Sequence, residues 1–365
     1  MMSEKRVLIL SEAFGAGHTK AAEAIKSGIE LLNPGWRIEV IELGSWLRPK
    51  LNYLITDIYL KTLRFSPKLW GVIYRRIQDK SSNPKVEFIL HRIIYAHIMK
   101  LLQEYQPDVI ISTHPFPSAV ISRLKRLGLK VPLHTVLTDF GAHGSWISSG
   151  VDYYYVPSIQ TKKELIKLGV AGNRVIVTGI PTNPKFWKRE SKELIRKKLG
   201  LEDKPTVLYM GGGLGLGLTN DFIEGLSHLG DIQLLIVTGK NKKLFSSLHE
   251  HFQDKNLNIQ LYGFVENVDE LMDAADLLIT KPGGVTSAEA IEKGLPMLLL
   301  NPIPGQEEDN SSYIVQNKLG LKIHNEKEMN QILEEFLKEP TMLSGFRYPA
   351  FNGKKTIEKI ALRIG

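Results

Sequence analysis

Lys281 and its neighbours form the pattern in this chain that points most directly to chemistry. Residues 279–291 read ITKPGGVTSAEAI, in which an apolar run ends in a Pro-Gly-Gly turn and a helical pattern opens at Thr286. A strand, a tight turn and a helix N-terminus present free backbone N–H groups and the positive end of the helix dipole to an anion. The spacing therefore predicts an anion-binding turn at Gly283 and Gly284, with Glu289 in the first turn of the helix.

A second polar stretch follows the next strand-like run. Residues 301–310 read NPIPGQEEDN and form a loop dense in amide and carboxylate groups, among them Gln306 and Glu307. Carboxylates accept hydrogen bonds from hydroxyl groups, and amides both accept and donate them, so the loop suits a hydroxyl-rich ligand. Together with the preceding turn, it predicts a nucleotide-sugar pocket.

A glycine-rich motif near the N-terminus is a candidate catalytic loop. Residues 11–18 read SEAFGAGH, and they lie between the first strand-like run and a helix expected at 19–32. Gly15 and Gly17 allow the backbone to approach a ligand closely, and His18 has the side chain of a general base near neutral pH. The structural alternative is that His18 only caps or packs at the helix start. The dinucleotide fingerprint G-x-G-x-x-G is absent, because Lys20 occupies its third glycine position.

Two further motifs follow strand-like runs. Residues 210–217 read MGGGLGLG, a pattern typical of a phosphate cradle, although a glycine turn without a ligand is the alternative. Asp139 and His143, with Trp146 after them, stand at the end of another expected strand. Ligands of open α/β sheets bind at that edge, so both are candidate site residues; the alternative for Asp139 is a cap on the following turn.

Metal ligation is not suggested anywhere in the chain. It contains no cysteine, no His-Glu-x-x-His motif and no Asp-x-Asp pair. We therefore expect no metal ion and no other cofactor. Charge on a leaving group would then be met by backbone amides and helix N-termini.

Composition and charge bound the class of protein. A length of 365 residues predicts about two domains, and 43% hydrophobic with 24% charged residues is typical of a soluble globular chain. The formal charge of +8 and pI near 9.3 indicate an anionic partner: nucleic acid, a phosphorylated ligand or an acidic membrane face. Without cysteines, a long apolar run or a signal sequence, the chain is expected to be cytoplasmic and not membrane-spanning.

Short β-branched runs alternate with helical patterns through both halves of the chain, which predicts parallel βαβ units. The expected strands are residues 7–10, 37–41, 109–112, 133–137, 153–156, 175–177, 206–210, 233–237, 259–262, 277–280 and 297–300. A basic stretch at 185–204 separates two such series. We therefore predict an α/β protein with two doubly wound, Rossmann-like domains facing each other across a cleft, over residues 1–190 and 191–340.

Residues 46–80 break this alternation. The segment carries leucine and isoleucine at helical spacing, interleaved aromatic residues, and an excess of arginine and lysine over aspartate. Such an amphipathic, basic segment is typical of a peripheral helix on an anionic bilayer surface. A helical hairpin that covers the N-terminal sheet is the alternative. Contact with nucleic acid is not expected, because the basic residues accompany an apolar helical face.

Jointly, the motifs resemble a known family. The chain is similar to the monogalactosyldiacylglycerol synthases and bacterial processive diacylglycerol glucosyltransferases, and more distantly to the N-acetylglucosaminyltransferase that completes lipid II. The resemblance spans nearly the whole chain. It rests on residues 15–18 with Ala21 and Ala22, residues 138–140 with His143 and Trp146, and residues 179–181, 211–213, 281–289 and 304–310.

The resemblance implies a GT-B fold of the glycosyltransferase family 28 type, with the acceptor bound by the N-terminal domain and a UDP-sugar by the C-terminal one. It implies an inverting, metal-independent hexosyltransferase of glycolipid synthesis that acts on diacylglycerol or a related lipid, peripherally bound at the inner face of the cell membrane through residues 46–80. Residues 341–365 would pack back on the N-terminal domain. The implied site residues are His18 and Asp139 for catalysis, Gly17, His143 and Trp146 for the acceptor, Glu289 for the ribose, Gln306 and Glu307 for donor hydroxyls, and Gly212, Gly213, Lys281, Gly283, Gly284 and Thr286 around the diphosphate.

The chain departs from the family pattern at one place. Members commonly carry an arginine after Gly-x-Pro, where it meets the diphosphate, whereas this chain has Asn183 there and Lys185 two residues later. A lysine supplies a point charge but not a bidentate fork. Two alternatives therefore stay open: a UDP-sugar epimerase of the same fold, and a non-catalytic protein that binds UDP-sugar. The sugar, the lipid, the number of sugars added and the oligomeric state are not determined by the sequence.

Overall fold

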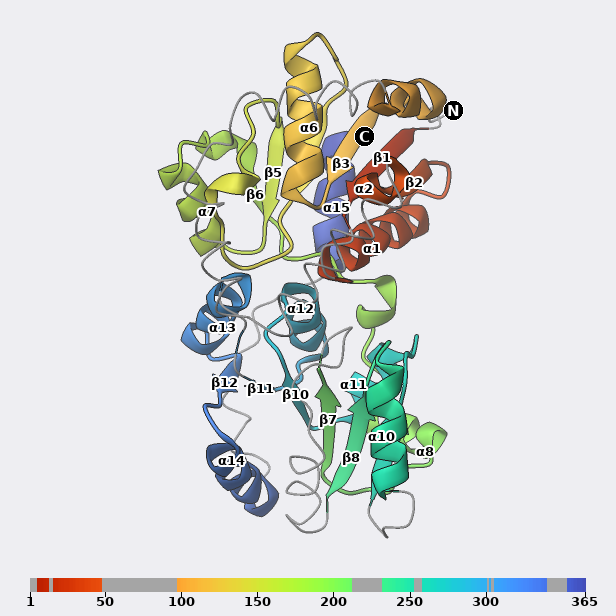
Figure 1. Cartoon of the computed structure of the whole chain (residues 1–365), viewed down its shortest axis with the longest axis vertical. Helices are drawn as coiled ribbons and strands as arrows, with labels where there is room; N and C mark the ends of the chain where they lie inside the picture. The colour runs from red at the N-terminus through yellow and green to blue at the C-terminus, as the bar shows by residue number, and fades with distance from the viewer. Residues whose placement is uncertain are drawn as a thin grey trace. The chain divides into compact units, whose positions relative to one another are not determined.

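The computed structural model describes residues 5–12, 16–47, 97–211, 232–252, 258–300, 302, 305–339 and 353–365. Within these residues the chain forms two parallel sheets of six strands each, packed with helices (Figure 1). It divides into two compact units. The first runs to Pro184 and includes the C-terminal helix α15 (Gly353–Ile364), and the second begins at Lys185, a few residues before the expected division at residue 190.

The sheet of the first unit has the strand order β2-β1-β3-β4-β5-β6, and every neighbouring pair is parallel. Residues 7–10 of β1 are all buried, so both faces of the sheet are covered, which explains an apolar run without alternation. The direction of strand addition reverses at β1, which has β2 on one side and β3 on the other. The strands are β1 (Arg6–Ser11), β2 (Arg37–Glu42), β3 (Val109–Ser112), β4 (Leu133–Val136), β5 (Tyr153–Val156) and β6 (Val175–Val177).

The helices of the first unit bury one apolar face each against this sheet. In α1, Ala21, Ile25 and Ile29 lie at helical spacing and are buried. Helix α15 packs beside α1, and the Thr356 hydroxyl donates a 2.6 Å hydrogen bond to the Thr178 carbonyl. The helices here are α1 (Ala16–Leu32), α2 (Leu43–Leu47), α6 (Pro115–Arg126), α7 (Ile159–Lys167) and α15, with a further helical segment at 97–105.

The second unit repeats this architecture with the strand order β12-β11-β10-β7-β8-β9, again parallel throughout. Strand addition reverses at β7, which lies between β10 and β8. The strands are β7 (Thr206–Met210), β8 (Gln233–Val237), β9 (Ile259–Tyr262), β10 (Leu277–Thr280), β11 (Met297–Leu299) and β12 (Gly320–Lys322). The helices are α8 (Lys192–Leu199), α10 (Lys242–Phe252), α11 (Val268–Ala274), α12 (Gly284–Lys293), α13 (Gln306–Gln316) and α14 (Glu326–Lys338).

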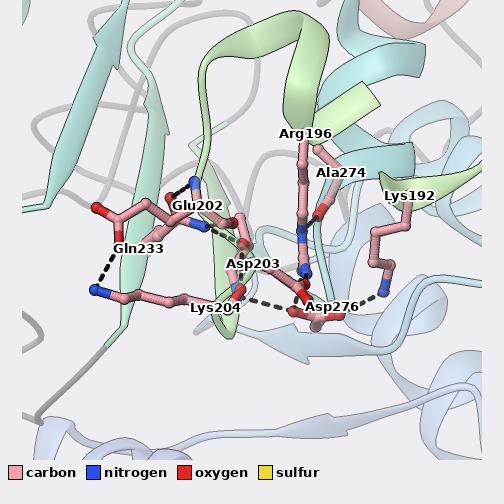
Figure 2. A network of polar contacts seen from close by, with 9 residues as sticks. Lys192, Arg196, Glu202, Asp203, Lys204, Gln233, Ala274 and Asp276 are labelled. Atoms are coloured by element: carbon pink, nitrogen blue, oxygen red, sulfur yellow. Dashed lines mark hydrogen bonds and ion pairs between the residues drawn. The ribbon is translucent and has the colours of Figure 1, made fainter. Parts of the chain in front are cut away.

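An ion-pair network fastens α8 to the amino ends of β7 and β10. Figure 2 shows Asp276 between the side chains of Arg196 and Lys192. Arg196 Nη2 lies 2.6 Å from Asp276 Oδ2, and the same oxygen accepts a 2.8 Å hydrogen bond from the Thr206 backbone N–H. Arg196 also donates to the Ala274 carbonyl, and its side chain is 9% exposed. The buried centre of the network is therefore Arg196, which is paired with Asp276 and bonded to the backbone.

The sequence-based expectations for secondary structure are confirmed, with four corrections. Helix α1 begins at Ala16, three residues before the expected start at Thr19, so Gly17 and His18 lie within the helix. All the expected strands are present, but the structure adds β12, whose three residues are too short and too weakly apolar to stand out. Helix α12 begins at Gly284, two residues before Thr286. Gln306 and Glu307 open helix α13, so they lie on a helical turn and not in a loop.

Part of the expected organisation lies outside the described residues. Of the segment 46–80, the structure describes Trp46 and Leu47, which are partly buried against the core of the first unit. Residues 48–80 lie outside the described part of the chain, as do all of residues 341–352. In the ranges that are described, no helix combines the length and apolar character needed to cross a bilayer.

Candidate functional site

The first candidate site lies at the carboxyl ends of β1 and β3, where strand addition reverses. Open α/β sheets bind their ligands at this position, because the connections from the two strands leave in opposite directions. Ser11 ends β1, and Thr113 directly follows β3. Helix α1 starts there and carries His18 in its first turn, where the side chain is buried.

The hydrogen bonds of His18 determine which nitrogen carries the proton. Its Nδ1 lies 2.9 Å from the Thr113 carbonyl oxygen and 2.8 Å from the Thr138 hydroxyl oxygen. A carbonyl oxygen can only accept, so Nδ1 must carry a hydrogen. In the neutral imidazole, Nε2 then has the free lone pair and is the nitrogen that can accept a proton.

Burial keeps the histidines of this site neutral. Desolvation lowers the pKa of His18, while the charge of Asp139 and the bond to Thr113 partly oppose the shift. Burial also lowers the pKa of His143 to about 4, and it lowers the pKa of His114 well below the ordinary value. An unprotonated imidazole at neutral pH is the form in which a general base works.

The predicted acceptor residues gather around His18. Gly17 precedes it in α1, and the Trp146 ring lies 6.1 Å from both the His18 and the His143 ring. Trp146 is fully buried in the core of the first unit, so it packs between that core and the two histidine rings. His143 Nδ1 is bonded to the Ser145 hydroxyl at 2.6 Å. Gly15 lies outside the described residues.

The sequence assigns no role to the side chains of Glu12 and Thr138, and it gives His114 only a weak signal at the end of an expected strand. His114 caps α6, its Nδ1 accepting from the Phe116 N–H at 3.1 Å, and its ring meets the His18 ring edge-on at 4.6 Å. Glu12 directly follows β1, and Thr138 lies two residues after β4, within motifs already singled out. A polar residue at that position is the sequence feature that would have flagged both.

Glu12 is a buried carboxyl group directly after β1. Its Oε1 accepts a 2.8 Å hydrogen bond from the Gly44 N–H, and Oε2 has no hydrogen-bond partner. Burial raises the pKa of Glu12 to about 8, and the charge of Glu42 adds to the effect. At neutral pH this group is therefore a protonated, uncharged acid.

The second candidate site lies at the carboxyl ends of β7 and β10, the corresponding reversal point of the second unit. The Thr280 hydroxyl donates a 2.8 Å hydrogen bond to the Met210 carbonyl, which ties the two strand ends together. Gly211 follows β7 directly. Gly212 and Gly213 lie outside the described residues, so their placement stays a prediction.

Helix α12 presents an open N-terminus at this edge. Its N-cap residue, Gly283, makes no side-chain capping hydrogen bond, and the first turn contains no acidic residue. Ser287 in that turn is fully buried, and its hydroxyl has no hydrogen-bond partner. The first backbone amides of α12 are therefore suited to an anion.

Polar side chains from β10, α12 and α13 surround this helix start. Lys281, between β10 and α12, is half-buried; burial lowers the pKa of its ammonium group, and the charge of Glu307 opposes the shift. Thr286, Glu289 and Gln306 are half-buried as well. The Asn310 amide donates a 3.0 Å hydrogen bond to the Pro282 carbonyl, so α13 holds the Pro-Gly-Gly turn in place. Sequence reasoning assigned no role to Asn310.

Comparison with known proteins identifies the family. The chain is 30% identical over 348 residues to the processive diacylglycerol beta-glucosyltransferase of Bacillus licheniformis, covering 94% of this chain and 90% of that protein. It is also 30% identical over 347 residues to the protein of that name from Bacillus subtilis, with the same coverage. Residues 18–182 match the family model for monogalactosyldiacylglycerol (MGDG) synthase, and residues 206–358 match the glycosyltransferase family 28 C-terminal domain. The chain belongs to this monogalactosyldiacylglycerol synthase and processive diacylglycerol glucosyltransferase family.

The fold of this family member agrees with the expected GT-B class. MurG of Acinetobacter baumannii superimposes with a TM-score of 0.64 at 15% sequence identity, over 98% of this chain and 99% of that one. A UDP-GlcNAc 2-epimerase from Neisseria meningitidis, solved with UDP-GlcNAc bound, has a TM-score of 0.60 at 15% identity, over 98% and 100% of the two chains. At this level of identity the likeness concerns the fold alone.

Lys185 opens the second unit, and its Nζ donates a 3.3 Å hydrogen bond to the Glu266 carbonyl oxygen. Lys281 lies between β10 and α12 and is half-buried. No group of three or more histidine, aspartate or glutamate side chains suited to a metal ion occurs among the described residues.

Proposed function

We propose that this protein is an inverting hexosyltransferase that moves a sugar from a UDP-hexose to the hydroxyl of diacylglycerol or a related lipid at the membrane surface. The observation that carries the proposal is His18 at the β1–β3 reversal point, with Nδ1 bonded to the Thr113 carbonyl and Nε2 left as the base. The 30% identity to processive diacylglycerol beta-glucosyltransferases supports the same conclusion.

The chemistry is a single in-line displacement. The lipid hydroxyl oxygen forms a bond to the anomeric carbon of the sugar, and the bond from that carbon to the phosphate oxygen breaks. The hydroxyl proton passes to Nε2 of His18, and UDP leaves with the bonding electron pair. Positioning of the two substrates and stabilisation of the departing charge supply most of the acceleration in such a reaction.

The second unit supplies the groups that bind the sugar donor, UDP-hexose. We assign the diphosphate to the open N-terminus of α12, around Gly283, Gly284 and Thr286, with the Lys281 ammonium beside it. Gly212 and Gly213 would complete this cradle. Glu289 would bind the ribose, and Gln306 and Glu307 the hexose hydroxyls. Amides and a lysine can neutralise the leaving group, so the reaction is proposed to need no metal ion.

Membrane docking is the finer part of the proposal. We assign it to residues 46–80, on the basic, aromatic and apolar pattern of that segment, at the inner face of the cell membrane. An epimerase of the same fold would need neither a lipid nor such a segment. The likeness to the Neisseria epimerase is one of fold, whereas the curated relatives named as transferases share 30% of their residues with this chain.

The test combines a transfer assay with a binding assay. Purified protein is mixed with radiolabelled UDP-glucose, then UDP-galactose, and liposomes with or without diacylglycerol, and UDP binding is measured as protection against thermal unfolding. His18→Ala should lose at least about a hundredfold in transfer while UDP protection persists, because general bases contribute about 10²–10⁴-fold. Lys281→Met should lose UDP protection. His249→Ala, at an exposed histidine of α10, is the matched control and should change neither.

Three outcomes would contradict the proposal. Undiminished transfer by His18→Ala would remove the assigned base. Sugar release or epimerisation that is independent of diacylglycerol would favour the epimerase, and UDP-sugar binding without any product would favour the non-catalytic alternative.

A further inference from the structure

Thr138 stands between His18 and Asp139. Its hydroxyl oxygen lies 2.8 Å from His18 Nδ1 and 3.4 Å from Asp139 Oδ2. Asp139 influences His18 through its charge, and the atom that lies between them is the Thr138 hydroxyl. The Asp139 carboxylate therefore contacts the Thr138 hydroxyl, which in turn contacts the His18 imidazole.

The direction of each hydrogen bond in this line follows from the donors available. The Thr113 carbonyl requires a hydrogen on His18 Nδ1, so the Thr138 oxygen beside that N–H must accept. The Thr138 hydroxyl hydrogen is then free to point to Asp139, as the geometry of their contact allows. A positive charge that forms on the imidazole during proton transfer is met by an oxygen that is itself polarised by a carboxylate.

The loop that carries Thr138 and Asp139 is held in place from another helix. Thr161 of α7 donates a 2.6 Å hydrogen bond to the Phe140 carbonyl, and the Glu164 carboxylate accepts a 3.0 Å bond from the Ala142 N–H. Thr138 itself is 2% exposed. A buried hydroxyl on an anchored loop has little freedom to leave the imidazole, which is the property that a positioning group needs.

We propose that Thr138 is a positioning residue of the transfer reaction: it accepts from the Nδ1–H that the Thr113 carbonyl fixes on His18, and it links Asp139 to the imidazolium that forms when Nε2 takes the acceptor proton. The inference rests on the proposed function, since it assigns His18 as the base. In the first unit, the other titratable groups that face His18 are His114, after β3, and His143, before η1 (Gly144–Trp146). Both are neutral near pH 7, so Asp139 supplies the negative charge that stabilises the His18 imidazolium through the Thr138 hydroxyl.

The test compares three threonine variants by their pH dependence. Thr138→Val removes the hydroxyl at nearly constant volume, and Thr138→Ser keeps it. Thr135→Val is the matched control, because Thr135 is another buried threonine at the end of the same strand, with its hydroxyl bonded to Ser118 at 2.9 Å. For each variant, kcat, KM for the UDP-sugar, the pH profile of kcat/KM and UDP protection are measured.

The expected result is a loss of about 10–100-fold in kcat for Thr138→Val, with KM for the UDP-sugar and UDP protection unchanged. Without the Thr138 hydroxyl, the link between Asp139 and His18 is lost and the imidazolium is less stabilised. The pKa of His18 therefore falls, and the acidic limb of the profile moves to lower pH. Thr138→Ser should restore both quantities to within a few fold, and Thr135→Val should shift neither. Asp139→Asn should move the limb in the same direction and add little further loss in the Thr138→Val background.

Wild-type kcat and an unmoved acidic limb in Thr138→Val would overturn the inference. Equal impairment of Thr138→Ser and Thr138→Val would assign the effect to disturbed packing and not to the hydroxyl, since serine keeps the hydroxyl, and would overturn it as well. If Thr138→Val fails to fold, the pH profile of Asp139→Asn decides alone. His18→Ala separates the two proposals: an inactive His18→Ala with a normal Thr138→Val refutes only the role of Thr138, whereas an active His18→Ala refutes the proposed function.

Discussion

Burial sets the protonation states of Glu12 and His18, the two ionisable residues at the β1–α1 connection. The carboxyl of Glu12 and the imidazole of His18 are both nearly inaccessible, and in each case burial disfavours the charged form. The pKa shifts have opposite sign because a carboxyl is charged when deprotonated and an imidazole when protonated. At neutral pH the carboxyl after β1 is therefore a neutral acid, and the imidazole in the first turn of α1 is a neutral base.

The raised pKa of Glu12 predicts that the stability of the folded protein depends on pH. In the unfolded chain its carboxyl should titrate near the ordinary value of 4.5, whereas in the folded protein its pKa is about 8. The native state thus binds the extra proton between these values, so its stabilisation is complete below about pH 4.5 and is lost as the pH rises toward about 8. Thermal unfolding should show the midpoint of the wild-type protein falling across this window.

Glu12→Gln keeps an acceptor for the Gly44 N–H but does not titrate. At about pH 9 its unfolding midpoint should exceed that of the wild type by roughly 2–6 °C, since about 1 kcal/mol shifts the midpoint by 2–4 °C in domains of this size. Glu30→Gln, at an exposed residue of α1, should leave the pH dependence unchanged. Identical pH profiles for wild type and Glu12→Gln would show that Glu12 ionises freely.

At the scale of elements, the candidate binding groups and the stabilising ion pairs of the second unit lie at opposite ends of its strands. The carboxyl ends of β7 and β10 carry the open start of α12, while the amino ends are tied to α8 by Arg196 and Asp276. The first group is left with unsatisfied donors, which suits a ligand, and the second has its charges paired and bonded. Substitutions in the two groups should therefore have different consequences.

Asp276→Asn should destabilise the second unit without altering its binding groups. It leaves Arg196, whose side chain is 9% exposed, without its main counter-charge, and the expected cost is about 2–3 kcal/mol of unfolding free energy. Urea unfolding measures this loss. Lys198→Met, which breaks the more exposed Lys198–Glu270 pair, is the control and should cost less than about 1 kcal/mol. Equal effects of the two substitutions would contradict the buried character of the network.

At the scale of the whole molecule, the two units are not two consecutive pieces of chain. Helix α15, at the C-terminal end, belongs to the first unit, where Lys359 donates to the Val177 carbonyl at 3.0 Å and Lys5 donates to the Gly365 carbonyl at 3.2 Å. The sequence predicts that residues 341–365 pack on the N-terminal domain. Residues 353–365 make these contacts with the first unit. Stability of the first unit therefore depends on residues 353–365.

Ile360→Ala tests this dependence. Ile360 is fully buried, so its truncation should cost about 2–5 kcal/mol, whereas Leu362→Ala, on the same helix at 81% exposure, should cost less than about 0.5 kcal/mol. Calorimetry with and without UDP assigns the loss: the lowered transition should be the one that UDP does not protect. A loss confined to the UDP-protected transition would place α15 with the wrong unit.

The sequence by itself determined the fold class, the strands apart from β12, and the family. Continuous β-branched runs predict buried parallel strands, and the Gly-x-Gly-His and Lys-Pro-Gly-Gly motifs lie at strand ends, because these features depend on residues that are neighbours along the chain. Only the tertiary structure decided how His18 is protonated: its partners Thr113 and Thr138 are 95 and 120 positions away in the sequence. The same holds for the neutral state of Glu12, the start of α12 at Gly284 and the anchoring of its turn by Asn310. Each of these depends on burial or on hydrogen bonds between distant segments, and those arise only when the chain has folded.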